Sequence, residues 1–573
     1  MFALKNTQTL NSKWLVIFLL FTSYYLPNTA HAIVDPLSVP NNKFGIHIIT
    51  PSPDESSPAA QLVNTNGDWG YVTFLIESKD RNESKWQEFF NDLRRRHLIP
   101  IVRLATKPLN EHWEKPYEGE EQAWADFLDK LNWPVKNRYI VIYNEPNHGA
   151  EWNLQTDPVS YAKVLDKTID ALKKKSADFF VMNAGFDASA PHLPPKYFDE
   201  VAFLKEMDKA VPGILNKLDG WASHSYPNPG FTGSSNGSGR GTVRSWYWEL
   251  QVLRSLGVTK NLPVFITETG WKHAEGLSFE KNLPTSDVVA DYFEYAFGNA
   301  WNSDRIVAVT PFLLNYQETP FDHFSFKKNN SPDYYPQYQT LLNMPKINGQ
   351  PVQENKTQIV KGEVYSSIVA GETYSISLTF KNTGQSIWGD SDPVKLVPIQ
   401  GGADLGIQTI EIPRGTKVAP SQEYTFNISL KAPDKGSFNL MLNLFIGDTQ
   451  FESNPVEFTT EVKLPVILQV LNSLKWKNSV EGEYILSISG VVGNSSQKVF
   501  LGPNGKSKEI EARYLLPDYS FNFTLEKPFY QPKIITQKMQ AGVNILDFRA
   551  LQPDFLQILL NPKALWAISP WSN

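Results

Sequence analysis

Residues 139–147 read Tyr-Ile-Val-Ile-Tyr-Asn-Glu-Pro-Asn, an apolar run that ends in a polar turn carrying a glutamate. Residues 263–271 repeat this arrangement as Pro-Val-Phe-Ile-Thr-Glu-Thr-Gly-Trp. Short runs of Val, Ile and Phe are typical of strands that are buried on both faces of a parallel sheet. Each stretch therefore predicts a buried strand with a glutamate, Glu145 or Glu268, at its carboxyl end.

Eight strands of this kind are expected between Lys43 and Pro345, separated by stretches with helical spacing. The predicted strands are Phe44–Ile49, Tyr71–Glu77, Ile99–Ala105, Tyr139–Asn144, Phe179–Ala184, Leu218–His224, Val264–Glu268 and Ile306–Leu314. The helical stretches include Ser84–His97, Glu120–Leu131, Val159–Lys174, Val243–Leu256 and Asp287–Trp301. Eight strand-then-helix units in about 300 residues predict a (β/α)8 TIM barrel, whose sites lie at the carboxyl ends of the strands. An open doubly wound sheet would alternate similarly, but no Gly-rich phosphate loop follows the first strand.

After Pro345 the pattern changes to strict alternation of polar and apolar residues. The clearest stretches are 374–380, 424–430 and 438–444. Alternation with a period of two, broken by frequent turn residues, is typical of antiparallel β-sandwiches. We therefore assign 33–345 to the barrel, 346–463 to a β-sandwich and 464–573 to a second β-rich module. Residues 380–388, Phe-Lys-Asn-Thr-Gly-Gln-Ser-Ile-Trp, resemble the immunoglobulin-like modules of many secreted and surface proteins.

The composition and the first residues indicate where the protein acts. Residues 1–32 read as a secretory signal, because an apolar run precedes Ala30-His31-Ala32, which is a small-x-small cleavage pattern. The apolar run is well short of the roughly 20 residues that span a bilayer, which argues against an uncleaved membrane anchor. We expect a secreted or extracellular protein, with association at a cell surface left open. A net charge of −6 and a pI near 5.9 give no electrostatic reason to bind nucleic acid or an anionic membrane.

No cofactor is expected. The chain has no cysteine, which excludes disulfides and thiolate metal sites. Its nine histidines show no ligand spacing, so a metal is not indicated.

Two glutamates at the ends of separate barrel strands indicate a particular chemistry. A retaining glycosidase uses one carboxylate as nucleophile at the anomeric carbon and a second as acid and then base. Two carboxylates about 5 Å apart disfavour each other's charged forms, so one can stay protonated while the other attacks. The alternative is that either glutamate is a rim residue paired with a Lys or Arg.

The motifs Asn144-Glu145-Pro146, His224-Ser225-Tyr226 and 267–271 resemble those of clan A glycoside hydrolases. They are most similar to family 39-like or family 5-like endoglycosidases, and the resemblance covers residues 43–345. It implies a retaining enzyme that cleaves β-glycosidic bonds of a polysaccharide or oligosaccharide, with Glu145 as general acid/base and Glu268 as nucleophile.

Further residues are candidates for contact with the substrate. Asn144 would bond the sugar 2-hydroxyl, and Tyr226 would donate a hydrogen bond to Glu268. His224 would contact substrate or support a carboxylate, with a core histidine as the alternative. Arg103, on the third strand, would pair with one of the glutamates or form a purely structural ion pair.

Aromatic residues just past the strand ends could stack on a sugar face, although each could equally be core packing. These are Trp271, Trp152, Trp113 and Tyr316. Many clan A members have a tryptophan at the end of the eighth strand, but here 310–316 read Thr-Pro-Phe-Leu-Leu-Asn-Tyr, leaving Phe312 or Tyr316 for that role.

Two polar stretches lie outside this set. Residues 230–241 predict a mobile loop on the same rim as the glutamates. Residues 94–97, Arg-Arg-Arg-His, predict a solvated helix end. Two other interpretations remain: a non-catalytic carbohydrate-binding or cell-surface structural protein on the same scaffold, and an enzyme that transfers the glycosyl group instead of hydrolysing it.

Overall fold

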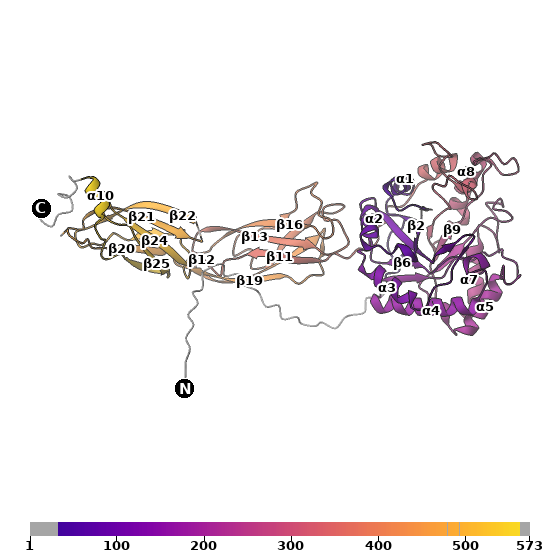
Figure 1. Ribbon diagram of the computed structural model, residues 1–573, viewed down its shortest axis with the longest axis horizontal. Helices are drawn as coiled ribbons and strands as arrows, with labels where there is room; N and C mark the ends of the chain where they lie inside the picture. The colour runs from indigo at the N-terminus through magenta and orange to yellow at the C-terminus, as the bar shows by residue number, and fades with distance from the viewer. Residues whose placement is uncertain (1–32, 478, 492, 562–573) are drawn as a thin grey trace, which may run out of the picture.

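The computed structural model describes residues 33–561 except 478 and 492. It places three bodies in a row (Figure 1): an α/β barrel, then two β-sandwiches. The predicted secretory signal, residues 1–32, lies outside the described residues. Among the described residues, no helix combines the length and apolar character that crossing a membrane requires.

Eight parallel strands form the barrel. In spatial order they are β1 (Gly45–His47), β2 (Gly70–Glu77), β3 (Leu98–Ala105), β6 (Arg138–Val141), β7 (Phe179–Met182), β8 (Trp221–His224), β9 (Val264–Glu268) and β10 (Ile306–Val309). The strands pair as one group of five and one group of three. Two parallel bridges, Met182 with Gly220 and Phe44 with Val309, close the ring. The predicted barrel is confirmed.

Helices surround the strands. They are α1 (Pro53–Asn64), α2 (Glu83–Arg95), α3 (Glu120–Lys130), α4 (Pro158–Lys175), α5 (Glu200–Ala210), α6 (Ile214–Lys217), α7 (Ser245–Ser255), α8 (Ser286–Tyr295) continued by the π-helix η3 (Ala296–Ala300), and α9 (Pro336–Asn343). Short elements lie between strands and helices: η1 (Ser78–Asp80), β4 (Pro108–Leu109), β5 (His112–Trp113), η2 (Gly149–Glu151) and η4 (Asp322–Phe324).

The barrel strands are buried on both faces, which explains their continuous apolar runs. Side chains of one face fill the barrel interior, where Tyr139 contacts Phe180 and Phe265 with ring centroids 5.1 and 5.2 Å apart. Side chains of the other face, such as Ile140 and Val264, pack against the helices. Because all eight strands are parallel, their carboxyl ends share one rim of the barrel.

The first β-sandwich follows the barrel. One sheet has the order β11 (Thr357–Glu363), β13 (Thr373–Asn382), β16 (Glu423–Lys431). The other has the order β12 (Ser367–Val369), β19 (Val456–Lys463), β17 (Gly436–Ile446), β14 (Val394–Gln400), β15 (Ile410–Glu411), with β18 (Thr449–Gln450) on β17. Alternate residues of both sheets share one core, among them Ile376, Leu378, Phe426, Ile428, Leu440 and Leu442. The immunoglobulin-like assignment stays a prediction.

The second sandwich is built in the same way. Its sheets are β23 (Ile510–Ala512), β20 (Val466–Leu471), β26 (Gly542–Asp547), and β22 (Gly493–Leu501), β21 (Gly482–Gly490), β24 (Ser520–Glu526), β25 (Lys533–Lys538). A shared core includes Val466, Leu468, Tyr484, Leu486, Phe521 and Phe523, and the short helix α10 (Phe555–Leu560) follows. The prediction of two β-rich modules after the barrel is confirmed.

His97, two residues after the end of α2, attaches the barrel to the first sandwich. The prediction of a solvated face for residues 94–97 is therefore wrong for Arg94 and His97, whereas Arg95 is exposed as predicted. Arg94 is 2% exposed and donates to the carbonyl oxygen of Asn132 at 2.8 Å. His97 Nδ1 lies 2.9 Å from Asp68 Oδ1, and its Nε2 lies 2.8 Å from Asp390 Oδ2 in the sandwich. Burial alone would lower the pKa of His97, but the bonds to Asp390 and Asp68 raise it to about 9.

Replacing His97 with Asn is expected to weaken the protein below about pH 8 and much less at pH 10. Asn tolerates the left-handed backbone of this residue, φ 53°, but cannot bridge two carboxylates. Because the folded-state pKa is raised, the stabilisation is full below the unfolded value of 6.5 and is lost as pH rises through about 9. Since the ion pair is partly exposed to solvent, we expect the loss of unfolding free energy below pH 8 to be roughly 1–2 kcal/mol.

Urea midpoints of the whole chain at pH 6, 8 and 10 measure this effect. The exposed His192 supplies a matched control for the exchange of a histidine for asparagine, and the midpoints of His192→Asn should stay close to those of the wild type. A His97→Asn difference that is constant from pH 6 to pH 10 would contradict the ion-pair explanation.

Candidate active site

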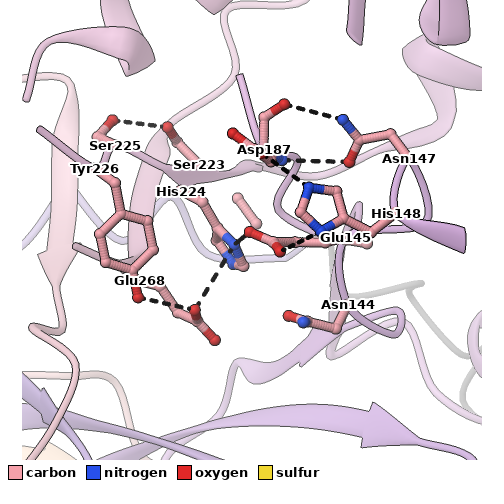
Figure 2. A network of polar contacts seen from close by, with 12 residues as sticks. Asn144, Glu145, Asn147, His148, Asp187, Ser223, His224, Ser225, Tyr226 and Glu268 are labelled. Atoms are coloured by element: carbon pink, nitrogen blue, oxygen red, sulfur yellow. Dashed lines mark hydrogen bonds and ion pairs between the residues drawn. The ribbon is translucent and has the colours of Figure 1, made fainter. Parts of the chain in front are cut away.

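The two glutamates meet at the rim. Glu268 is the last residue of β9, the seventh barrel strand, and Glu145 follows β6, the fourth. His224 ends β8 between them: its Nδ1 lies 2.8 Å from Glu145 Oε1 and 3.8 Å from Glu268 Oε2 (Figure 2). His224 is 3% exposed, so a single buried nitrogen contacts both carboxylates.

The backbone around Glu145 adopts an unfavourable conformation. Tyr143 and Glu145 have φ values of 68° and 27°, in a region that side chains other than Gly rarely occupy. The Glu145 N–H donates to the carbonyl of Gly185 at 3.1 Å, which helps to hold the turn. Strain of this kind costs about 1–3 kcal/mol per residue and concentrates at functional sites.

Glu268 is surrounded by donors and cations. Arg103 Nη1 lies 2.8 Å from Oε1, and the Tyr226 hydroxyl donates to Oε2 at 3.1 Å. Burial would raise the pKa of Glu268, but His224 and Arg103, with smaller effects from His47 and Tyr226, hold it below its ordinary value. Glu268 is therefore ionised at neutral pH.

Arg103 organises a second residue of the site. The same Nη1 that contacts Glu268 donates to Asn144 Oδ1 at 2.6 Å. This leaves the amide of Asn144 fixed beside Glu145, its neighbour in the chain. The expected pairing of Arg103 with one of the glutamates is present, and the pair is only partly buried, with side-chain exposures of 13% and 10%.

Sequence reasoning missed His47. It ends β1 and is 1% exposed, with Nε2 3.8 Å from Glu268 Oε1. Burial lowers the pKa of His47 to about 3, so the ring is neutral. The rule that found the glutamates, a polar residue at the carboxyl end of a predicted strand, would have found His47 as well.

Glu151, in η2, is a third carboxylate that the sequence did not single out. Burial raises the pKa of Glu151 to about 7; Arg103 opposes this shift and the Glu145 carboxylate adds to it. Nothing in the sequence around Glu151 marks it, because it reaches the site through the turn after Asn144-Glu145, not from a strand end.

The prediction that aromatic residues stack on a sugar is wrong for two of the four candidates. Trp152 and Trp271 are 0% and 1% exposed, so neither ring offers a face to a sugar. Trp271 packs against Phe293 of α8 with ring centroids 5.0 Å apart, and its Nε1 donates to Gly233 O at 2.7 Å. The contact with Phe293 places the ring against the helix layer. Trp113, in β5, is half-buried.

Phe312 is the aromatic residue beside the glutamates. Its ring lies 5.2 Å from that of His47, which contacts Glu268. Tyr316 contacts the exposed Phe321 at 5.4 Å, and Phe321 contacts Phe312 at 5.2 Å. Of the two residues expected to replace the missing tryptophan, Phe312 therefore lies at the site. Tyr316 is separated from Phe312 by the ring of Phe321.

The Gly/Ser loop 230–241 reaches the site and is tied to its neighbours. Phe231 packs edge-on against Tyr226 with centroids 5.0 Å apart. Arg240 donates to the carbonyl of Ala190 at 3.3 Å and pairs with Asp199 at 2.7 Å. The loop thus forms a wall beside Tyr226, the residue that hydrogen-bonds Glu268.

Substituting Gly185 with Ala is expected to lower kcat/KM about a hundredfold while the chain still folds. A Cβ at Gly185 would collide with the His224 ring, which is buried and cannot move freely. Displacing His224 would disturb both carboxylates, and an ångström of misplacement can cost about 10²-fold in rate.

Gly298→Ala is the matched control, because nothing lies within 4 Å of a Cβ built there. Catalytic activity and far-UV circular dichroism would be compared for both variants. Wild-type activity in Gly185→Ala would show that the His224 position is not needed.

Among the described residues, no group of three or more His, Cys, Asp or Glu side chains is arranged to hold a metal ion. No protein-family model matches the chain, and no curated protein matches it. Solved structures, in contrast, do match the chain.

The chain is similar to a family 39 glycoside hydrolase from the gut symbiont Bacteroides cellulosilyticus WH2, with 14% identity over 70% of this chain and 82% of that chain and a TM-score of 0.36. It is similar to the endo-beta-1,4-glucanase Xac0030 from Xanthomonas axonopodis pv. citri carrying a triple mutation, with 15% identity over 52% and 98% and a TM-score of 0.34. A family 30 subfamily 8 xylanase from Clostridium acetobutylicum matches at 9% identity over 69% and 98%, with a TM-score of 0.33. The first and the third of these proteins are named as glycoside hydrolases, and the second is named as an endo-beta-1,4-glucanase.

Proposed function

We propose that the chain is a secreted, retaining glycoside hydrolase that cleaves β-glycosidic bonds of a polysaccharide or oligosaccharide by double displacement. Glu268 is the nucleophile and Glu145 the general acid/base. Residues 1–32 are removed on export, so the enzyme acts outside the cytoplasm. The two sandwiches space the barrel or contact glycan or a cell surface.

The contact of both carboxylates with His224 Nδ1 carries this proposal. Because Glu145 Oε1 and Glu268 Oε2 lie 2.8 and 3.8 Å from one atom, they can be no further apart than the sum of these distances. Retaining enzymes hold their two carboxyl groups about 5–5.5 Å apart, whereas inverting enzymes need roughly 6.5–9.5 Å to admit a water. The upper bound set by these two distances lies at the lower edge of the inverting range, so the bridge through one nitrogen favours the retaining arrangement.

In the first step, ionised Glu268 attacks the anomeric carbon while Glu145 gives a proton to the departing glycosidic oxygen. Arg103 and Tyr226 aim the two oxygens of Glu268 and keep the carboxylate ionised. Asn144, held by Arg103, is placed to bond the sugar 2-hydroxyl, an interaction that strengthens in the transition state.

In the second step, Glu145, now without its proton, removes a proton from water, which attacks the glycosyl ester of Glu268. Esterification removes the negative charge of Glu268, and its field no longer acts on Glu145 or on His224. The ring of Phe312 beside His47 supplies an apolar surface on which a sugar face can stack.

A glycan panel tests the proposal. Protein from Ile33 onward, with its Glu145→Gln and Glu268→Gln variants, would be incubated with plant, microbial and exopolysaccharide β-glycans, and products followed by mass. Cleavage by the wild type alone, with retained anomeric configuration in proton NMR, is the expected result. Equal products from all three proteins would refute the assigned roles.

The other candidate functions give different results in the same panel. A non-catalytic binding protein would leave every glycan intact yet bind one of them. A cell-surface structural protein would show neither cleavage nor affinity for glycan. Transfer to a second sugar would give products longer than the starting oligosaccharide.

A further inference from the structure

Glu145 lies between two imidazole rings, not one (Figure 2). Its Oε1 faces His224 at 2.8 Å, and its Oε2 faces His148 Nδ1 at 3.8 Å. The reaction proposed above uses the His224 side and gives His148 no role. His148 lies three residues after Glu145, in the turn that follows the fourth barrel strand.

Asp187 holds His148 in this position. The second ring nitrogen, Nε2, lies 2.8 Å from Asp187 Oδ2, and the other carboxylate oxygen accepts the N–H of Ser189 at 2.7 Å. Asn147 joins the two loops: its Nδ2 donates to the carbonyl of Asp187 at 2.9 Å, and its Oδ1 accepts the Asp187 N–H at 3.3 Å. Side chain and backbone thus fix the pair as one unit, as Figure 2 shows.

The groups around His148 favour its charged form. Asp187 faces it from the loop after β7, Glu145 from its own turn and Glu151 from η2, while the ring of Tyr197 lies 5.0 Å away. Burial would lower the pKa of His148, but Asp187, Glu145 and Glu151 raise it to about 9. His148 is therefore a cation throughout the neutral range.

We propose that His148 and Asp187 form a positioning pair that holds Glu145 and keeps a positive charge beside its Oε2. The inference rests on the proposed function, in which Glu145 must act first as acid and then as base. A fixed cation beside Oε2 favours the ionised form. The pair thus favours the form of Glu145 that acts as base in the second step. It also limits how far the pH can rise before Glu145 can no longer act as acid in the first step.

A titration without any glycan tests the electrostatic link. Nitrogen NMR of the imidazoles in the whole chain would follow His148 in the wild type, in Asp187→Asn and in Glu145→Gln. We expect its midpoint to fall by at least about one pH unit in Asp187→Asn and by a smaller, measurable amount in Glu145→Gln. Because coupling between two sites is reciprocal, the second shift equals the effect of His148 on Glu145. An unchanged midpoint in Glu145→Gln would overturn the proposal.

The pH dependence of kcat/KM tests the consequence, on whichever glycan the wild type cleaves. Without the cation Glu145 keeps its proton to higher pH, so His148→Gln should move the alkaline limb up by about half to one pH unit. In Asp187→Asn, His148 stays a cation below its lowered midpoint, so this variant should move the limb by less. If His148 and Asp187 act as a unit, the variant that carries both substitutions should shift the alkaline limb no further than the larger of the two single shifts. His97→Asn, at the sandwich interface, should leave the limb in place.

A merely structural role would lower kcat/KM at every pH without moving the limb, and an unmoved limb in folded, active variants would overturn the proposal. Failure of the proposed function looks different: the wild type would cleave no glycan, and the titration of His148 would still decide whether the pair is coupled to Glu145.

Discussion

Glu268→Gln should abolish turnover, lowering kcat by at least about four orders of magnitude, the scale of loss when a catalytic nucleophile is removed. The amide has the shape of the carboxylate, and its single oxygen can still accept from Arg103 or from Tyr226, which donate to different oxygens of Glu268. It does not attack the anomeric carbon. Circular dichroism should match the wild type. Glu318→Gln, at an exposed glutamate in the loop after β10, is the matched control and should retain full activity.

Azide distinguishes loss of the nucleophile from damage to the site. In Glu268→Gly the space of the side chain can admit azide, which would attack from the same face as the missing carboxylate. The product of this single displacement is a glycosyl azide of inverted configuration, detectable by mass and by proton NMR. Normal turnover by Glu268→Gln, or hydrolysis by Glu268→Gly without azide at the wild-type rate, would refute the assignment.

Glu145→Gln should show an effect that depends on the leaving group. For natural glycosides, whose leaving oxygen needs a proton, we expect a loss of about 10²–10⁴-fold, the usual contribution of general acid catalysis. Aryl glycosides with acidic phenols leave without help, so their first step should stay fast while the second, which needs the base, slows.

The glycosyl ester on Glu268 should therefore accumulate and appear as a burst of phenol and as added mass on the intact protein. A loss that is equal for all leaving groups would contradict the acid/base role. Because Glu151 is a second carboxylate close to Glu145, Glu151→Gln should be measured beside it. Only the acid/base variant should show the leaving-group dependence.

The strands and the two glutamates were predictable from local pattern. A strand buried on both faces leaves a run such as Tyr139–Ile142, and a polar residue at its carboxyl end must lie on the rim once eight strands are parallel. The count of predicted strands placed the glutamates at the ends of the fourth and seventh strands, and the structure has them there. The bond from Tyr226 to Glu268, expected among the candidate site contacts, is also present.

Residues that reach the site through turns were not predictable in this way. His148 and Asp187 lie in loops and Glu151 lies in the single-turn helix η2, where no periodicity indicates which way a side chain points. Trp152 and Trp271 were misjudged for the same reason: position just past a strand end does not tell whether a ring turns toward the rim or toward the helices.

The sequence by itself determined the barrel, the change to β-sandwiches after it and the two carboxylates at one rim, because burial on one or both faces leaves a periodic signal in the chain. Only the tertiary structure decided what each polar group meets. His97 looked like the end of a solvated helix until Asp390, 293 residues away, came against it. His148 is held in its charged form by the carboxylate of Asp187, which lies 39 residues further along the chain. Charge and hydrogen bonding depend on distances of a few ångströms between segments remote in sequence, and no local pattern records those distances.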